Sequence, residues 1–125
     1  MPSYIQELAQ EERMKGELEI AYEVQASFLP RRMPMVEGLD LAAMCLPALE
    51  IGGDYYDFVE LEKGRLAVVI GDVSGKGIQA AFYMTLVKGF FQTLCRMIDS
   101  PAELLRRLNV LFCENVPRGT FISMI

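Results

Sequence analysis

The first part of the chain combines charged side chains with regularly spaced apolar ones. From Tyr4 to Phe28 the residues favour helix, and apolar side chains recur three and four positions apart, which predicts an amphipathic helix that ends before Pro30. Such a stripe suits contact with a partner helix as well as packing on the same domain, and the sequence leaves both alternatives open. The positions on the stripe are Leu8, Met14, Leu18, Ala21, Val24 or Gln25, and Phe28.

Short apolar runs after this helix predict strands. Leu39–Leu46 alternates imperfectly and predicts a strand that Pro47 closes. Ile51–Val59 and Arg65–Asp72 predict two further strands, and the Lys63-Gly64 pair between them predicts the turn of an antiparallel hairpin. Such a hairpin places the start of its first strand beside the end of its second.

Two helices and a final strand are predicted after the hairpin. Ser100–Glu103 reads as a capping box with proline at the first helical position, and it predicts a helix that continues to about Asn115. Thr120–Ile125 predicts a strand, inside which the chain stops. Before these, Ile78–Ile98 is apolar on nearly every side, which predicts a helix covered on most sides. Polar residues interrupt this helix too often for a membrane span: Gln79, Lys88, Gln92 and Arg96.

Composition limits the class of protein. With 125 residues and 52% hydrophobic side chains, the chain is long enough for one domain with a packed core. A net charge of -5 with scattered basic residues argues against a nucleic-acid surface. Cys45, Cys95 and Cys113 lack the spacing of a zinc site or a disulfide framework, and no secretory signal is present, so a reducing, cytoplasmic setting without membrane attachment is expected.

Two acidic residues stand at glycine corners at the open end of the predicted hairpin. The apolar run Val68–Ile70 leads into Gly71–Gly77, so a buried strand delivers Asp72 into a glycine-rich turn that opens a helix. Gly52-Gly53-Asp54 repeats this arrangement on the first strand. Because the chain contains no histidine, two carboxylates at glycine corners predict an oxygen-ligated hard cation such as magnesium or manganese.

Other interpretations of these residues were weighed against the metal site. A nucleotide-binding P-loop fails on spacing in Gly71–Gly77, because three residues instead of four separate the first glycine from the glycine-lysine pair. Capping of the following helix is the structural alternative for Asp72, although Ser74 could supply that cap. Asp57 is interpreted as a hydrogen-bonded structural carboxylate, and Lys76 as either a phosphate contact or a solvated lysine.

Three segments together resemble a known family. Ala21–Pro30 is similar to a linker helix with its glutamine and terminal leucine-proline, and Gly52–Phe58 and Gly71–Ala81 are similar to two acidic motifs. In this order, and followed by a hydrophobic helix, they resemble the metal-dependent protein serine/threonine phosphatases of the type 2C (PPM) kind. The resemblance is to the bacterial branch typified by sporulation stage II protein E and the sigma-B regulatory phosphatases, and it extends from about Leu18 to the end of the chain.

This resemblance implies an α+β fold, part of an α-β-β-α sandwich of antiparallel sheets flanked by helices. Residues 1–30 would form an amino-terminal linker or regulatory helix. Residues 31–125 would form the amino-terminal portion of a phosphatase domain, because the family carries further metal-binding aspartates in downstream motifs that this chain does not reach. The 125-residue chain alone is therefore expected to be inactive or nearly so.

The resemblance also implies a centre of two manganese or magnesium ions. Asp72 would bridge both ions, the backbone carbonyl of Val73 would complete one of them, and Asp54 would bind a metal directly or through its water. Gly75, Lys76 and Gly77 are weaker candidates for contact with substrate phosphate.

The implied function is hydrolysis of phosphoserine or phosphothreonine on a regulatory protein of the anti-anti-sigma type, within a partner-switching pathway. A non-catalytic dimerisation scaffold or pseudophosphatase is the alternative. A homodimer is expected in either case, through the amino-terminal helix or through the exposed edge of the sheet.

Overall fold

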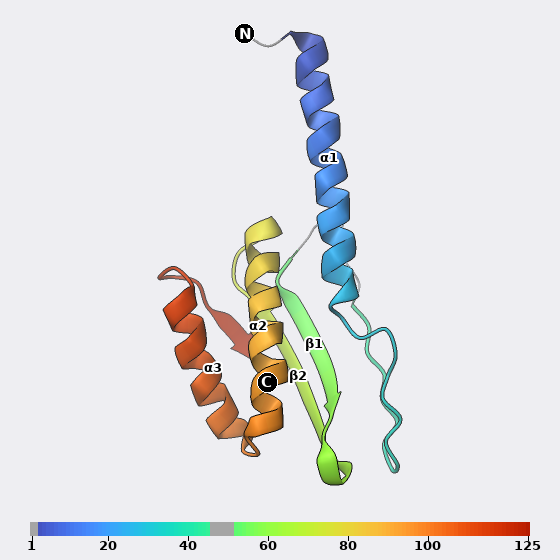
Figure 1. The fold of residues 1–125 in the computed structure, drawn as a ribbon, viewed down its shortest axis with the longest axis vertical. Helices are drawn as coiled ribbons and strands as arrows, with labels where there is room; N and C mark the ends of the chain where they lie inside the picture. The colour runs from blue at the N-terminus through green and yellow to red at the C-terminus, as the bar shows by residue number, and fades with distance from the viewer. Residues whose placement is uncertain (1–2, 46–51) are drawn as a thin grey trace.

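The computed structural model describes residues 3–45 and 52–125, which form three α-helices and one antiparallel sheet (Figure 1). The predicted α+β class, with a helix ahead of an antiparallel sheet flanked by helices, is confirmed. The described residues supply one sheet and one helical layer of the expected sandwich. The elements in chain order are α1 (Tyr4–Ser27), β1 (Asp54–Glu60), the 3-10 helix η1 (Glu62–Gly64), β2 (Leu66–Val73), α2 (Gly77–Met97), α3 (Pro101–Asn115) and β3 (Ile122–Met124).

The predicted hairpin is confirmed. β1 pairs antiparallel with β2 along the whole length of β1, from Glu60 opposite Leu66 to Asp54 opposite Asp72. The connection η1 contains Lys63 with φ 62°. The residues on either side of η1 are hydrogen-bonded, because the Leu61 amide donates to the Arg65 carbonyl at 2.8 Å. The tight turn and the alternation of side chains together fix this register.

The final strand pairs with the other edge of β2. β3 runs antiparallel with Val73 opposite Ile122, and backbone hydrogen bonds between Ile70 and Ile125 extend the pairing beyond the strand bounds. The strand predicted over Thr120–Ile125 is therefore paired on one of its two edges within the chain. The part of β2 from Leu66 to Val69 has no strand on that side within the described residues.

The strand expected over Leu39–Leu46 is not formed in its described part. Residues 39–45 have no strand pairing, and Leu46 and Pro47 lie outside the described residues. Ala42, Ala43 and Met44 are exposed. An imperfect alternation without a neighbouring strand to pair with does not fix a β-conformation.

Helices α2 and α3 cover one face of the sheet, and the core lies between them and that face (Figure 1). The α2 helix was expected to be covered on most sides, yet Phe82 is 68% exposed and Ile78 also faces solvent. Ser100 caps α3 by accepting the Glu103 amide at 3.3 Å. The reciprocal half of the capping box is absent, because the Glu103 carboxylate pairs with Arg106 and Arg107 instead.

The α1 helix projects away from the body, and only its carboxyl end touches the rest of the described chain (Figure 1). None of its residues is buried, and Leu8, Met14 and Leu18 on the predicted stripe are exposed. The alternative in which the stripe packs on its own domain is therefore wrong for most of the helix. A capping box between Ser3 and Gln6, which the sequence analysis did not identify, starts the helix.

The other face of the sheet is open. Val68 and Ile70 of β2 and the flanking Phe121 and Ile125 are all more than half exposed.

Within residues 3–45 and 52–125, no helix is both long enough and apolar enough to cross a bilayer.

Candidate metal centre

Asp54 and Asp72 lie directly opposite each other on neighbouring strands. The next pair along the ladder, Gly53 and Val73, is hydrogen-bonded, because the Val73 amide donates to the Gly53 carbonyl at 3.1 Å. The aspartates therefore occupy a non-hydrogen-bonded position, where the Cα atoms are only about 4.5 Å apart and the side chains approach most closely. Both side chains are exposed on the open face of the sheet. The expectation that the hairpin brings the two acids together is confirmed.

The two carboxyl groups repel one another. Partial desolvation raises the pKa of Asp54 above its ordinary value, and the charge of Asp72 and hydrogen bonding to its side chain raise it further. Like charges that face each other across a sheet are unfavourable unless a proton or a cation lies between them. The structure thus places two oxygen donors where a hard cation would relieve their repulsion.

A cavity of about 420 Å³ opens over this pair. Cys45 from the segment before β1, Tyr56 from β1 and Ser123 from β3 contribute to its walls. Burial raises the pKa of the Cys45 thiol, and the nearby Asp54 charge raises it further. The thiol is therefore held in its neutral form beside the acids, and the carboxylates remain the anionic donors.

The close approach of Gly53 to Val73 explains why a glycine stands directly before Asp54. A Cβ atom on Gly53 would lie 2.5 Å from the backbone oxygen of Val73 and 2.9 Å from its Cβ. Only glycine allows β1 to approach the Val73 carbonyl, which is the group expected to complete a metal site, this closely. The buried Val73 side chain points into the core and so holds this carbonyl in place.

The glycine-rich turn before α2 has the backbone that the sequence predicted. Gly75 and Gly77 have φ values of 94° and 69°, which glycine adopts without strain. Lys76 between them is the exposed N-cap of α2 and makes no side-chain capping bond. Ser74 does not cap α2 either, since its hydroxyl accepts the Phe121 amide at 2.9 Å and joins the turn to the approach of β3.

Gln25 is a contact of the site that the sequence analysis did not assign. Its side-chain amide donates to the Gly52 carbonyl, and its Oε1 accepts the Gly52 amide at 3.4 Å. The carboxyl end of α1 is thereby attached two residues ahead of Asp54. A polar residue at a position of the apolar stripe is the signal that could have identified this contact.

Asp57 is a structural carboxylate, as predicted. It is 4% exposed, and its Oδ2 accepts the Tyr55 hydroxyl at 2.6 Å and the Gln92 amide at 2.9 Å. Burial raises the pKa of Tyr55, and the bond to Asp57 raises it further, so the phenol stays protonated as a donor. Tyr55 is buried and Tyr56 is only partly buried, because successive side chains of β1 point to opposite faces of the sheet.

Within the part of the chain that the structure describes, no group of three or more acidic, cysteine or histidine side chains could hold a metal ion. Asp54, Asp72 and the Val73 carbonyl fit a hard cation in donor chemistry, but they are fewer oxygen ligands than such a cation takes. Fold and site together define an α+β protein with an acidic, metal-compatible edge on an antiparallel hairpin.

Comparison with known proteins assigns the family. Residues 62–125 match the family described as Stage II sporulation protein E (SpoIIE). This match spans β2, α2, α3 and β3 and includes Asp72. The chain belongs to the SpoIIE family, in agreement with the resemblance of its acidic motifs.

Several curated proteins are similar to the chain, and three of them illustrate the likeness. Phosphoserine phosphatase RsbU of Bacillus subtilis is 38% identical over 114 residues, which cover 91% of this chain and 34% of RsbU. Protein IcfG of Synechocystis is 39% identical over 83 residues, covering 66% of this chain and 12% of that protein. Phosphoserine phosphatase RsbP of Bacillus subtilis is 27% identical over 96 residues, which cover 76% of this chain and 23% of RsbP. The chain spans about one third of the length of RsbU and less of the other two.

Proposed function

We propose that this chain contributes the first two acidic ligands of a metal-dependent phosphatase that hydrolyses phosphoserine or phosphothreonine on a regulatory protein. The observation that carries the proposal is the pairing of Asp54 with Asp72 at the open end of the hairpin. Family membership and the names of the relatives RsbU and RsbP, both called phosphoserine phosphatases, support it.

Asp54, Asp72 and the Val73 carbonyl are the groups that would hold manganese or magnesium, two ions in the complete centre. Such ions supply a water of lowered pKa as nucleophile and neutralise the phosphate oxygens. Asp72 would hold both ions and Asp54 one of them, directly or through water. Gly53 keeps the approach to Val73 clear, and the buried Val73 side chain fixes the direction of its carbonyl.

The glycine-rich turn is the place for contact with the substrate. Gly75, Lys76 and Gly77 lie at the start of α2, and the exposed Lys76 ammonium makes no ion pair with another described residue. A phosphoprotein of the anti-anti-sigma type, in a cytoplasmic partner-switching pathway, is the substrate class we propose. Residues 1–30 act as the linker or regulatory helix, and residues 31–125 as the amino-terminal portion of the phosphatase domain.

The α1 helix supports a dimer as part of this function. Its apolar stripe meets solvent along most of its length, and exposed apolar stripes of this kind pair with a partner helix. We propose that two copies associate through α1. Sedimentation equilibrium of the chain with and without residues up to Leu18 tests this, because a monomer in both cases contradicts a helix-mediated dimer.

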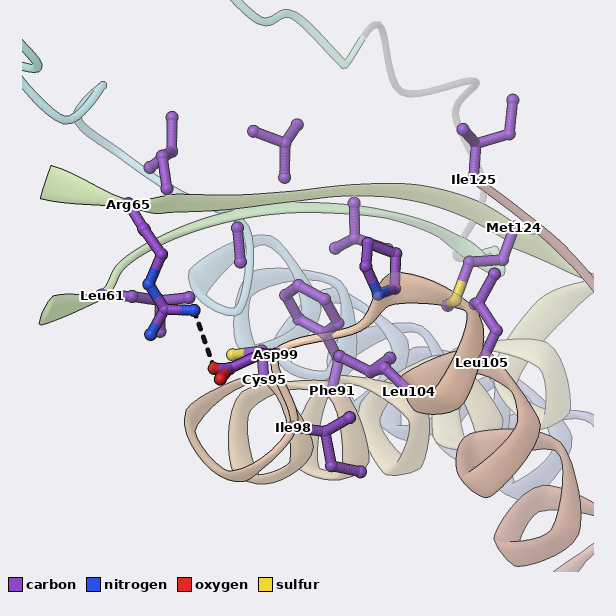
Figure 2. Close-up of a pocket in the computed structure, with 15 residues that line it drawn as sticks. Leu61, Arg65, Phe91, Cys95, Ile98, Asp99, Leu104, Leu105, Met124 and Ile125 are labelled. Carbon is purple, nitrogen blue, oxygen red and sulfur yellow. Dashed lines mark hydrogen bonds and ion pairs between the residues drawn. The ribbon is translucent and has the colours of Figure 1, made fainter. Parts of the chain in front are cut away.

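The second surface for association is the edge of β2 from Leu66 to Val69, which has no neighbouring strand on the β3 side within the described residues. Figure 2 shows a cavity beneath β2, with Leu61 and Arg65 at one end, Met124 and Ile125 at the other, and Phe91 on its wall. Its volume is about 520 Å³. If the dimer uses this edge instead of α1, truncation of the helix leaves the dimer intact, whereas Val68→Lys breaks it.

The direct test of the proposed function is release of phosphate from a phosphoserine protein and from a small aryl phosphate by the full-length protein. We expect turnover with manganese and none after its removal by a chelator. Asp72→Asn is expected to abolish turnover and to leave the fold intact, while Asp54→Asn leaves a residual rate if that ligand acts through water. Near-wild-type turnover by Asp72→Asn contradicts the assignment. A folded wild type without turnover would favour the non-catalytic scaffold.

A further inference from the structure

Lys88 connects three elements, α2, β1 and the end of α1. It lies on α2, and its ammonium group donates to the backbone carbonyl of Phe28 at the end of α1. The same nitrogen lies 3.5 Å from Oδ2 of Asp57 on β1 and 6.0 Å from the centre of the Phe28 ring. The Lys88 side chain is 21% exposed, so most of it is removed from water. One cation is therefore shared between the linker helix and a buried carboxylate.

Asp57 does not need this cation to satisfy its hydrogen bonds. Its two oxygens already accept the Tyr55 hydroxyl, the Gln92 amide and the backbone amide of Phe58. At 3.5 Å the contact with Lys88 is an ion pair, and the hydrogen bond of the ammonium goes to α1. The position of the cation is therefore set by the end of α1 as much as by β1.

The α1 helix depends on this contact in turn. The carboxyl end of a helix carries partial negative charge, and a cation near it is stabilising. The last turn of α1 contains no basic residue, so Lys88 supplies from α2 the cation that the helix lacks. No α1 residue is buried, and among the described residues the second polar attachment of its end is the bond between Gln25 and Gly52.

These two attachments lie on either side of Asp54 in the chain. Gln25 holds Gly52, two residues before it, and Lys88 faces Asp57, three residues after it. We propose, resting on the proposed function, that Lys88 is a positioning residue for Asp54. Through its contacts with Phe28 and Asp57, Lys88 couples the position of the end of α1 to the position of β1. Because Asp54 begins β1, this coupling changes the affinity of the centre for manganese. When α1 withdraws, Lys88 loses its acceptor at Phe28 and is no longer held in place beside Asp57, and Gly52 loses its contact with Gln25.

The test uses the full-length protein and four variants. Lys88→Met removes the charge and keeps the length of the side chain, and Lys88→Arg restores a cation. Asp57→Asn/Lys88→Met removes both charges together, which avoids an unpaired buried carboxylate. Lys63→Met, in the exposed η1 turn, is the matched control. Two quantities are measured for each: the manganese concentration at half-maximal turnover of an aryl phosphate, and amide hydrogen exchange in β1 and at the end of α1.

With Lys88→Met we expect the half-maximal manganese concentration to rise about tenfold, as for other residues that orient metal ligands. Turnover at saturating manganese is expected to be retained, and exchange to accelerate in Asp54–Glu60 and Ala21–Phe28. Lys88→Arg should restore both quantities, and Lys63→Met should change neither.

A folded Lys88→Met variant with wild-type manganese dependence and exchange would overturn the proposal. If Lys88→Met does not fold, the double variant decides by the same comparison with wild type. If wild-type protein shows no manganese-dependent turnover, the proposed function fails by itself. Hydrogen exchange then still tests the coupling: faster exchange in both segments of Lys88→Met supports it, and unchanged exchange overturns it.

Discussion

Removing one charge of the acidic pair should stabilise the metal-free fold. In Asp54→Asn the side chain keeps its shape and loses its repulsion from Asp72, which lies directly opposite. Two like charges 4 Å apart repel by about 1 kcal/mol in water and by about 4 kcal/mol at the effective dielectric near a protein surface. Both side chains are exposed, so the lower figure applies. We expect Asp54→Asn to raise the free energy of unfolding at neutral pH by about 1 kcal/mol when no divalent metal is present.

The pH dependence of this gain has a definite sign. The pKa of Asp54 is raised in the folded chain, so the folded state binds that proton more tightly than the unfolded state does. Above the folded pKa, the ionised carboxylate therefore lowers stability. The loss disappears as the pH falls through that raised pKa, and below the ordinary value both states are protonated. The gain from Asp54→Asn should be full at neutral pH and absent in acid.

Urea unfolding of the chain with a chelator present, at neutral pH and in acid, measures this effect. Asp40→Asn is the matched control, because Asp40 is exposed and forms no ion pair with another described residue. The reasoning is refuted if Asp54→Asn is no more stable than wild type at neutral pH, or if its gain persists unchanged in acid.

Three further predictions follow from named contacts. Gly53→Ala places a Cβ 2.5 Å from the Val73 oxygen and should cost about 1–3 kcal/mol of stability in urea unfolding. Gly52→Ala is the control and should cost clearly less, because no atom lies within 4 Å of its new Cβ. Equal losses of stability in the two variants would contradict the close approach. Gln25→Ala removes the bonds to Gly52 and should speed hydrogen exchange at the end of α1. Unchanged exchange would show that the contacts of Phe28 and Leu29 hold the helix without Gln25. The 125-residue chain alone should bind at most one manganese ion weakly and show negligible turnover, and robust turnover by a monomer would contradict the incomplete centre.

Local patterns were sufficient to predict the hairpin and the acidic pair. Alternation in β1 and β2 and the turn at Lys63-Gly64 fix the register, and this register alone places Asp54 opposite Asp72. The buried Asp57 was also assigned correctly, since a carboxylate on the inward face of a strand needs hydrogen-bond partners.

Contacts between distant segments could not be predicted in this way. The bonds from Gln25 to Gly52 and from Lys88 to Phe28 depend on where α1 ends relative to the sheet, and no local pattern encodes that position. The strand expected over Leu39–Leu46 failed for a related reason, because β-conformation requires a partner that the sequence pattern does not identify.

Binding of manganese to the full-length protein, followed by electron paramagnetic resonance, tests the metal centre most directly. Free manganese gives a strong signal, and its loss on titration reports binding independently of turnover. The account predicts that wild-type protein binds manganese and that Asp72→Asn loses this binding while remaining folded. Equal manganese affinity in wild type and Asp72→Asn would contradict the assignment of Asp72 and, with it, the proposed phosphatase centre.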